Sequence, residues 1–237
     1  MTEGTVLYKN LFLSALPPRD LAVLKPLLQF VELPQGKVLG EAGQRVSEVV
    51  FLEAGMVSLL TQMQDGSAIE IATLGRESIV GVLAALGNHR SNVRAIVQIA
   101  GSAWKVRAGD FRTAADKSRT LRNLVLLSSE LGMVQMQQIS ACNALHTAER
   151  RLCRWILQVR DRIDGDVIEL TQDFLAQMLA VRRPTVTLIA QSLQQAGLIR
   201  YRRGRITITD REGLEKRACE CLGEIRNKTR QILSELA

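Results

Sequence analysis

The sequence predicts an α+β fold: an N-terminal, jelly-roll-like β-roll, one long helix and a C-terminal winged helix-turn-helix. Three observations predict it. Short runs rich in Val and Ile, separated by turn signals, fill residues 30–106, as in a β-sandwich or roll. Near residue 110 the apolar period changes from two to 3.6. Residues 171–208 then read as two short helices and a hairpin.

These changes of pattern divide the chain into three expected parts. The β-roll takes residues 1–115, the long helix and a hinge take 116–145, and the helix-turn-helix unit takes 146–237. A short helix over 14–28, capped by Ser14, precedes the strands.

We expect seven or eight strands in the roll. The stretch GMVSLLTQMQDGSAIEIATL alternates apolar and polar residues on either side of Asp65 and Gly66. An Asp-Gly pair between two alternating runs predicts a hairpin with a type I′ turn.

The long helix carries an apolar stripe that steps by three and four residues, as a coiled-coil seam does. We expect this stripe to be a two-helix dimer seam, with Leu126, Met133 and Met136 turned toward the chain's own β-domain. The alternative is a helix that only packs on that domain. The seam residues are Leu124, Leu127, Leu131, Val134, Gln138, Ala141 and Leu145.

A break follows near residues 142–147, where Asn143 or Thr147 caps the next helix. That helix has an inner face with Trp155 at its centre, and a polar turn over 160–168 leads into a short strand. We place the boundary between the domains at this break.

The C-terminal part contains an unusual window of charge. Between Asp173 and Asp210 there are six arginines and no carboxylate. A solvated face mixes both signs, so this window indicates a polyanionic partner. Residues 141–237 also carry 17 Lys and Arg against 12 Asp and Glu, which localises the excess positive charge in this part of the chain.

The same window has the apolar spacing of two crossed helices, with Ala180 in the turn where Gly is usual. The outer face of the second helix begins at Arg183, which we expect to contact guanine, while Gln191 contacts adenine. Gly204 marks the tip of a hairpin wing whose arginines reach phosphates or the minor groove. The expected DNA-binding residues are Arg182, Arg183, Pro184, Thr185, Thr187, Leu188, Gln191, Arg202, Arg203 and Arg205.

The remaining composition excludes other classes of protein. The chain has no GxxxxGK, HExxH or CxxC motif and two histidines, so we expect no catalytic residue and no enzyme activity. No apolar run reaches the length of a membrane span and the first residues lack a signal peptide. We expect a cytoplasmic protein with no membrane partner.

The cysteines are too few for a disulfide scaffold. We expect Cys219 and Cys221 to be ordinary helix residues, and Cys142 and Cys153 to be reduced, packed thiols, so that the chain holds no metal. His89 and His146 have no obvious partner in the sequence, and we expect them to be structural.

The bacterial Crp/Fnr transcription regulators are the family that this order of parts resembles. Their winged helix-turn-helix is similar to LTQDFLAQMLAVRRPTVTLIAQSLQQAGLIRYRRGRITITD, and their hinge is similar to NALHTAERRLCRW. Their cyclic-nucleotide-binding roll is similar to residues 30–106 in architecture. The resemblance implies a homodimer on a two-fold double-stranded DNA site, with RNA polymerase as a further partner. It also implies an effector in the roll that alters the dimer helix.

The resemblance also locates a candidate effector site. In cAMP-binding members a Glu after Gly holds the ribose hydroxyl, and an Arg before Ser holds the cyclic phosphate. Here Val82 stands where that Glu should be, so the resemblance does not extend to a cAMP site unless Glu77 replaces it. The effector and any cofactor stay unknown, and the N-terminal cysteine cluster of iron–sulfur members and a haem ligand set are missing. The candidate effector residues are Gly81, Val82, Arg90, Ser91, Met136 and Gln137.

The recognition helix departs from the family pattern as well. A cAMP-binding member reads DNA with Arg, Glu and Arg, whereas the matching positions here are Arg183, Pro184 and Leu188. We therefore expect a different half-site. The leading hypothesis is a homodimeric, sequence-specific DNA-binding transcription regulator controlled by an effector at the roll. The alternative is a small-molecule sensor that acts through a protein partner rather than DNA.

Overall fold

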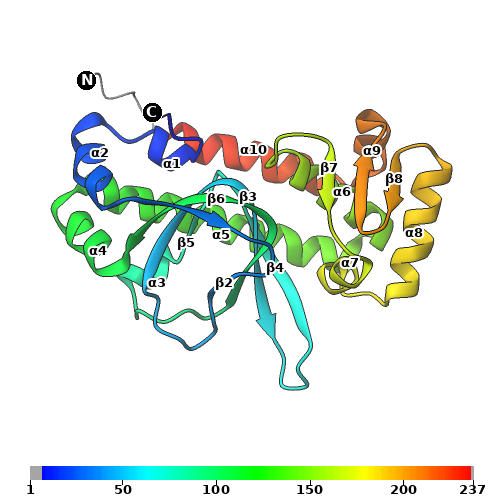
Figure 1. Ribbon diagram of the computed structural model, residues 1–237, viewed down its shortest axis with the longest axis horizontal. Coiled ribbons are helices and arrows are strands. Elements are labelled where there is room, and N and C mark those ends of the chain that lie inside the picture. The colour runs from blue at the N-terminus through cyan, green and yellow to red at the C-terminus, as the bar shows by residue number, and fades with distance from the viewer. Residues whose placement is uncertain (1–6, 236–237) are drawn as a thin grey trace.

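The computed structural model describes residues 7–235 and shows an elongated molecule with the β-roll at one end and the helix-turn-helix unit at the other. Two helices run along the long axis between them, α5 (Arg119–Leu145) and α10 (Cys221–Ser234), and pack on each other (Figure 1). No helix among residues 7–235 is both long enough and apolar enough to cross a bilayer. The α+β architecture predicted from the sequence is confirmed.

The roll is one antiparallel sheet with the strand order β1-β6-β3-β4, in which β2 also pairs with β6 and β5 with β3. Two of its strands are long and bent, with register shifts where they pair, so each serves on both sides of the roll. The prediction of seven or eight strands is therefore wrong, since six are present in the described part of the roll. They are β1 (Gln29–Leu33), β2 (Val38–Gly40), β3 (Glu48–Gln62), β4 (Ala68–Leu74), β5 (Ile79–Val80) and β6 (Arg94–Arg107).

The hairpin between β3 and β4 is confirmed, but its turn is not the predicted two-residue one. The loop spans residues 63–67, and Gly66 takes the left-handed conformation with φ 84°. The Met63 N–H donates to Ser67 O at 2.8 Å and closes the wider loop.

Short helices cover the end of the roll. Asn10 caps the first of them, because its Oδ1 accepts from the Phe12 and Leu13 N–H groups, whereas the helix expected over 14–28 begins only at Pro18, after Pro17. Ser14 is the last residue of that helix, so its predicted role as a cap is wrong. The helices are α1 (Leu11–Ser14), α2 (Pro18–Leu24), the 3₁₀ turn η1 (Lys25–Leu27), α3 (Val82–Leu86) and α4 (Ala108–Lys117).

One face of α5 is covered within the chain. Leu124, Leu127 and Leu131 are buried in a cluster that contains Phe12 of α1 and Ile232 of α10. Farther along, the Gln138 amide donates to Cys221 Sγ at 3.1 Å. A second copy of the chain has no access to these three leucines, so their assignment to a dimer seam is wrong. Within the chain, α1 and α10 contribute the residues that cover this stripe.

The opposite face of α5 is the one that lies free. Leu126 is 67 % exposed and Met133 is 52 % exposed, although both were expected to face the β-domain. Val134 and Gln138 are half-buried, while Ala141 and Leu145 are exposed. Met136, the third residue expected to face the β-domain, does line the cavity between the roll and α5. The expectation failed for Leu126 and Met133 because an apolar stripe shows burial without showing which neighbour provides it.

The C-terminal unit starts where Thr147 caps the next helix, as predicted. Its core surrounds the fully buried Trp155 and continues into the roll through Met56, Leu60 and Ile99. The two functional ends of the molecule thus share one apolar cluster. The elements are α6 (Ala148–Arg160), β7 (Val167–Glu169), α7 (Gln172–Leu179), α8 (Arg183–Gln195), β8 (Ile199–Arg202), β9 (Arg205–Ile208) and α9 (Arg211–Arg217).

Candidate DNA interface and effector cavity

The helix pair α7 and α8 is joined by a tight turn with a left-handed residue. Ala180 has φ 50° and ψ 46° and ends α7, which explains why Gly is the usual residue here. Pro184 lies in the first turn of α8, where its missing N–H costs no hydrogen bond. Val186, Ala190 and Leu193 are the buried residues of α8, and they fix the orientation of the helix.

The outer face of α8 is left free by this packing. Leu188 is 67 % exposed, and Arg183 and Gln191 are also exposed. Thr187 is half-buried, since its hydroxyl donates to Gln172 Oε1 at 2.9 Å. Exposed side chains lie at the other expected DNA-binding positions, namely Arg182, Pro184, Thr185, Arg202, Arg203 and Arg205.

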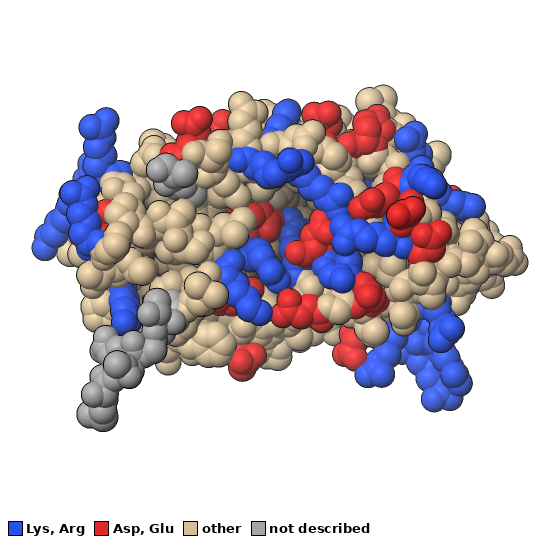
Figure 2. Space-filling view, turned by 90° about the horizontal axis from the view of Figure 1, so that it is seen from above, with Lys and Arg blue, Asp and Glu red and all other residues tan. Residues whose placement is uncertain are grey.

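The wing is a two-residue hairpin in which Arg202 pairs with Arg205. The two loop residues, Arg203 and Gly204, both have positive φ, at 50° and 74°, as a type I′ turn requires. Figure 2 shows Lys and Arg side chains projecting at the end of the molecule that carries α8. The arginine window of the sequence is thus placed on one protruding end.

Two of these arginines are paired in the free protein. Arg183 Nη1 lies 3.4 Å from Asp173 Oδ1, and Arg205 Nη2 lies 2.7 Å from Glu169 Oε1. All four side chains are more than half exposed, so the ion pairs are weak and exchangeable. The arginine window contains no carboxylate of its own, but the carboxylates of Glu169 and Asp173, which come just before it in the sequence, lie close to its arginines in the folded chain.

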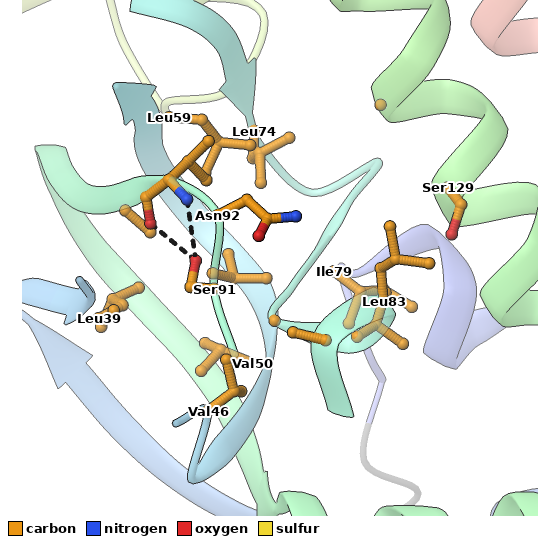
Figure 3. Close-up of a pocket in the computed structure, with 18 of the residues that line it drawn as sticks. Leu39, Val46, Val50, Leu59, Leu74, Ile79, Leu83, Ser91, Asn92 and Ser129 are labelled. Carbon is orange, nitrogen blue, oxygen red and sulfur yellow. Dashed lines mark hydrogen bonds between the residues drawn. The ribbon is translucent and has the colours of Figure 1, made fainter. Parts of the chain in front are cut away.

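A cavity of about 560 Å³ opens between the roll and α5. Aliphatic side chains from the strands and α3 supply most of its wall, including Leu39, Val50 and Leu83, while Ser129 faces it from α5 (Figure 3). This is the volume and composition of a small-molecule site. Because α5 forms part of the wall, an occupant would touch the helix that links the two ends of the molecule.

The structure brings five of the six candidate effector residues to this cavity: Gly81, Val82, Arg90, Ser91 and Met136. Gln137 is not among the lining residues and is exposed, so its predicted place in the site is wrong. The step of one residue turns its side chain away from the wall.

Glu77 is also outside this cavity. Arg162 binds it in a buried ion pair, which excludes it as a replacement ribose partner. Gly81 starts α3 with φ 78°, and a Cβ there would lie 2.9 Å from Glu48 O. Arg90 donates to Gly43 O at 2.7 Å, and Ser91 donates to Val93 O at 2.7 Å (Figure 3).

A second carboxylate is buried where the roll meets α6. The Ser58 hydroxyl donates to Glu70 Oε2 at 2.6 Å. Burial raises the pKa of Glu70 to about 7, against the opposing effects of Ser58 and of the Arg154 and Arg162 charges. This carboxyl group therefore changes protonation near neutral pH.

Four residues that were expected to act separately lie together at the end of α5. Cys142 Sγ is 3.5 Å from Cys219 Sγ, and His146 Nδ1 is 3.5 Å from Cys221 Sγ. His146, which has no obvious partner in the sequence, thus contacts Cys221 in the structure, and Cys219 lies in the loop before α10 rather than in the expected helix. The hydrogen bond with Cys219 and the Arg154 charge lower the pKa of the Cys142 thiol. Two features of the sequence could have indicated this cluster: the CxC motif at Cys219 and Cys221, and the spacing of about one helical turn between Cys142 and His146.

Comparison with known proteins explains the order of these parts. Residues 30–118 match the family described as "Cyclic nucleotide-binding domain", and residues 150–217 match the "Crp-like helix-turn-helix domain". The chain belongs to the Crp/Fnr family. It is thus a DNA-binding transcription regulator of Crp/Fnr type, with an effector-binding domain and a DNA-binding helix-turn-helix. The Crp/Fnr resemblance seen in the sequence is confirmed.

Individual Crp/Fnr relatives are similar over most of their length. The global nitrogen regulator of Synechococcus elongatus is 26 % identical over 199 residues, which cover 80 % of this chain and 90 % of the relative. FixK2 from Bradyrhizobium japonicum has the same fold, with a TM-score of 0.69 at 14 % identity over 81 % of this chain and 98 % of FixK2. A crp/fnr-family regulator from Eubacterium rectale gives a TM-score of 0.67 at 15 % identity over 85 % and 94 %.

Proposed function

We propose that this Crp/Fnr-family chain is a homodimeric regulator that reads a specific two-fold DNA sequence under the control of an effector in the roll. The observation that carries the proposal is the free outer face of α8 beside the arginine wing. Arg183 and Gln191 have the donor groups for guanine and adenine edges. Arg203, at the wing tip, has the charge and reach for a phosphate.

The proposed control runs through α5. Ser128, Ser129, Gly132 and Met136 of α5 line the cavity, so an effector that fills it changes the packing of this helix against the roll. The wall is mainly aliphatic and includes Arg90, and the carboxylate among its lining residues, Glu48, is paired with Lys105 at 2.6 Å. These residues favour a small effector with an apolar body and at most a small anionic group over cAMP.

The proposed dimer contact is the exposed face of α5. Leu126 and Met133 are seven residues apart and lie on the side that α10 leaves free. Large apolar side chains that are exposed in a row on a long helix favour an interface, and two copies joined here present two α8 helices to DNA.

Selection of binding sites from a random DNA library by the purified full-length chain tests this function. With no added ligand we expect a palindromic site, because two identical helices read related half-sites. If nothing is recovered, the selection is repeated with cyclic nucleotides and with a cell metabolite extract. A site that appears only then identifies an effector-dependent regulator, whereas continued failure favours the protein-partner alternative.

A further inference from the structure

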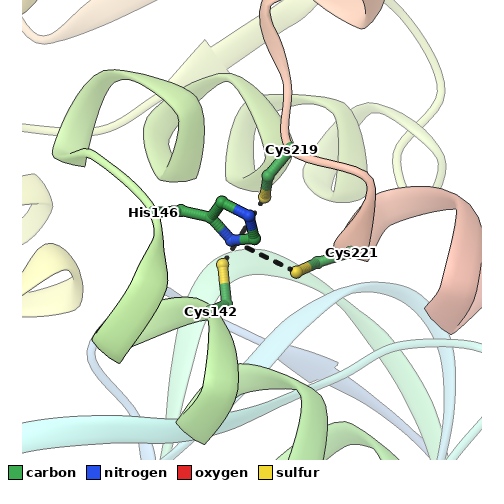
Figure 4. Close-up of side chains that lie close together, drawn as sticks. All are labelled: Cys142, His146, Cys219 and Cys221. Carbon is green, nitrogen blue, oxygen red and sulfur yellow. Dashed lines mark hydrogen bonds between the residues drawn. The ribbon is translucent and has the colours of Figure 1, made fainter.

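The cluster at the end of α5 joins three segments of the chain. Cys142 comes from the last turn of α5, His146 from the hinge, Cys219 from the loop before α10 and Cys221 from the first turn of α10 (Figure 4). The three sulfur atoms are buried and the His146 side chain is 11 % exposed. One ligand atom from each residue lies within 4.8 Å of all the others.

We propose that Cys142, His146, Cys219 and Cys221 form a tetrahedral zinc site that fixes the hinge to the C-terminal segment. Three thiolates and one imidazole are a ligand set of structural zinc. The proposal departs from the expectation, drawn from the sequence, that the chain holds no metal. It is independent of the proposed DNA site and effector.

The distances fit one ion rather than a larger cluster. With zinc–sulfur bonds of about 2.3 Å, two sulfur atoms of a tetrahedron lie ~3.8 Å apart. The Cys142–Cys219 and His146–Cys221 separations, both 3.5 Å, are close to this edge. An iron–sulfur cluster places its own iron and sulfide atoms between the thiolates and needs wider spacing than these four atoms have.

Groups around the cluster orient its ligands. His146 directs Nδ1 at the sulfur atoms, and its Nε2 lies 3.0 Å from Glu220 Oε1. A carboxylate behind a ligating imidazole fixes the tautomer and raises the basicity of the coordinating nitrogen. The Gln138 amide donates to Cys221 Sγ at 3.1 Å, which stabilises that sulfur as a thiolate.

The charge balance is also favourable. Zn²⁺ with three thiolates and a neutral imidazole has a net charge of −1, and each bound thiol releases its proton to solvent. Arg151 and Arg154 are close enough to interact electrostatically with Cys142. Both guanidinium groups are largely buried, and the Nε atom of each lacks a hydrogen-bond partner among the described residues. A negative site beside them compensates this buried positive charge.

Metal titration of the reduced full-length protein tests the proposal. Chelator-treated protein receives Co²⁺, and absorption is recorded before and after the addition of Zn²⁺. We expect sulfur-to-cobalt charge transfer and the intense visible bands of tetrahedral cobalt, saturating at one equivalent per chain and lost on addition of zinc. Because this titration uses the wild-type chain, it does not depend on the folding of a variant.

Variants then locate the ion. Cys219→Ser and Cys221→Ser should remove the cobalt spectrum, and Glu220→Gln should weaken zinc binding about 10-fold or more while keeping the spectrum. Cys153→Ser is the matched control, because Cys153 is a buried thiol in a different cluster and should leave binding unchanged. Circular dichroism verifies that each variant is folded.

Several outcomes would overturn the proposal. They are a cobalt spectrum without tetrahedral bands, equal loss of metal in Cys153→Ser, and a Cys142–Cys219 disulfide as the stable state in zinc-containing, oxidant-free buffer. Iron and sulfide in stoichiometric amounts in the protein as isolated without air would also overturn it. Loss of metal with unchanged recovery of a DNA site would leave the proposed function standing, so the two proposals fail separately.

Discussion

Arg162, just after α6, reaches into the roll and holds Glu77 in a buried ion pair, with Nε 3.0 Å from Oε1. Its Nη1 also donates to Thr73 Oγ1 at 2.9 Å. A Cβ on Gly75 would lie 2.4 Å from Arg162 Cδ, so only Gly admits the side chain. The contact between Glu77 and Arg162 connects the turn between β4 and β5 of the roll to the end of α6, the helix that precedes the DNA-binding helix-turn-helix.

Replacing Glu77 by Gln should lower the free energy of unfolding by about 3–5 kcal/mol, because it leaves Arg162 buried without a counter-charge. Urea unfolding followed by circular dichroism measures the change. Asp116→Asn is the control, since Asp116 pairs with Arg122 on the surface and its loss should have little effect. Similar losses for the two variants would contradict a special role for the buried pair.

The pH dependence of stability should depend on Glu70. Its pKa in the folded chain is raised to about 7 from 4.5, so the folded state retains its proton at pH values where the unfolded chain loses it. The stability that the protonated Glu70 carboxyl group gives to the folded state is therefore fully present below pH 4.5 and is lost as the pH rises through 7. Glu70→Gln should therefore be more stable than wild type at pH 8, by on the order of 3 kcal/mol, and equal to it near pH 4.5. A pH-independent difference between the two unfolding curves would be the contrary result.

Two arginines should affect DNA binding in different ways. Arg183→Ala should relax the preference at one base pair, with a loss of ~1–3 kcal/mol of discrimination. Arg203→Ala should weaken binding to all sequences and reduce the salt dependence of affinity. Fluorescence anisotropy with matched and mismatched duplexes at several salt concentrations separates the two effects. Equal, sequence-independent losses would show that α8 does not read bases.

A charged substitution on the exposed face of α5 tests the proposed dimer contact. Met133→Glu places a carboxylate next to its symmetry-related copy and should shift the chain from dimer to monomer in sedimentation equilibrium. Met63→Glu is the control, because Met63 is comparably exposed but lies in the hairpin loop. A variant at Met133 that remains as dimeric as the control would place the interface elsewhere.

Gly132 offers a prediction about α5 itself. It lies within the helix and no atom comes within 4 Å of a Cβ built on it, so Gly132→Ala should stabilise the fold by about 1 kcal/mol. Gly101→Ala should destabilise it, because a Cβ there would lie 2.0 Å from Ala54 O. Thermal unfolding measures both, and a loss of stability at Gly132 would mean that α5 needs flexibility at this point.

The sequence predicts what is encoded locally. The wing follows from Arg203-Gly204 between two apolar runs, and the helix-turn-helix follows from the spacing around Ala180, because turn geometry and helical period depend on near neighbours. The sequence does not predict which element packs against the stripe that contains Leu124, because any apolar surface could cover these side chains. Cys142 and Cys219 are 77 residues apart, and no period relates them. The Glu77–Arg162 pair likewise depends on how two domains pack.

The apolar cluster that runs from Met56 and Leu60 of the roll to Trp155 and Leu175 of the DNA-binding unit joins the two ends of the molecule through one continuous core. We expect the two ends to melt together rather than in separate transitions, because an isolated C-terminal fragment would expose apolar surface that the roll covers. Moving one end relative to the other means breaking dense packing before new packing forms. We therefore expect any movement of one end relative to the other to be a switch between two discrete arrangements rather than a gradual bend.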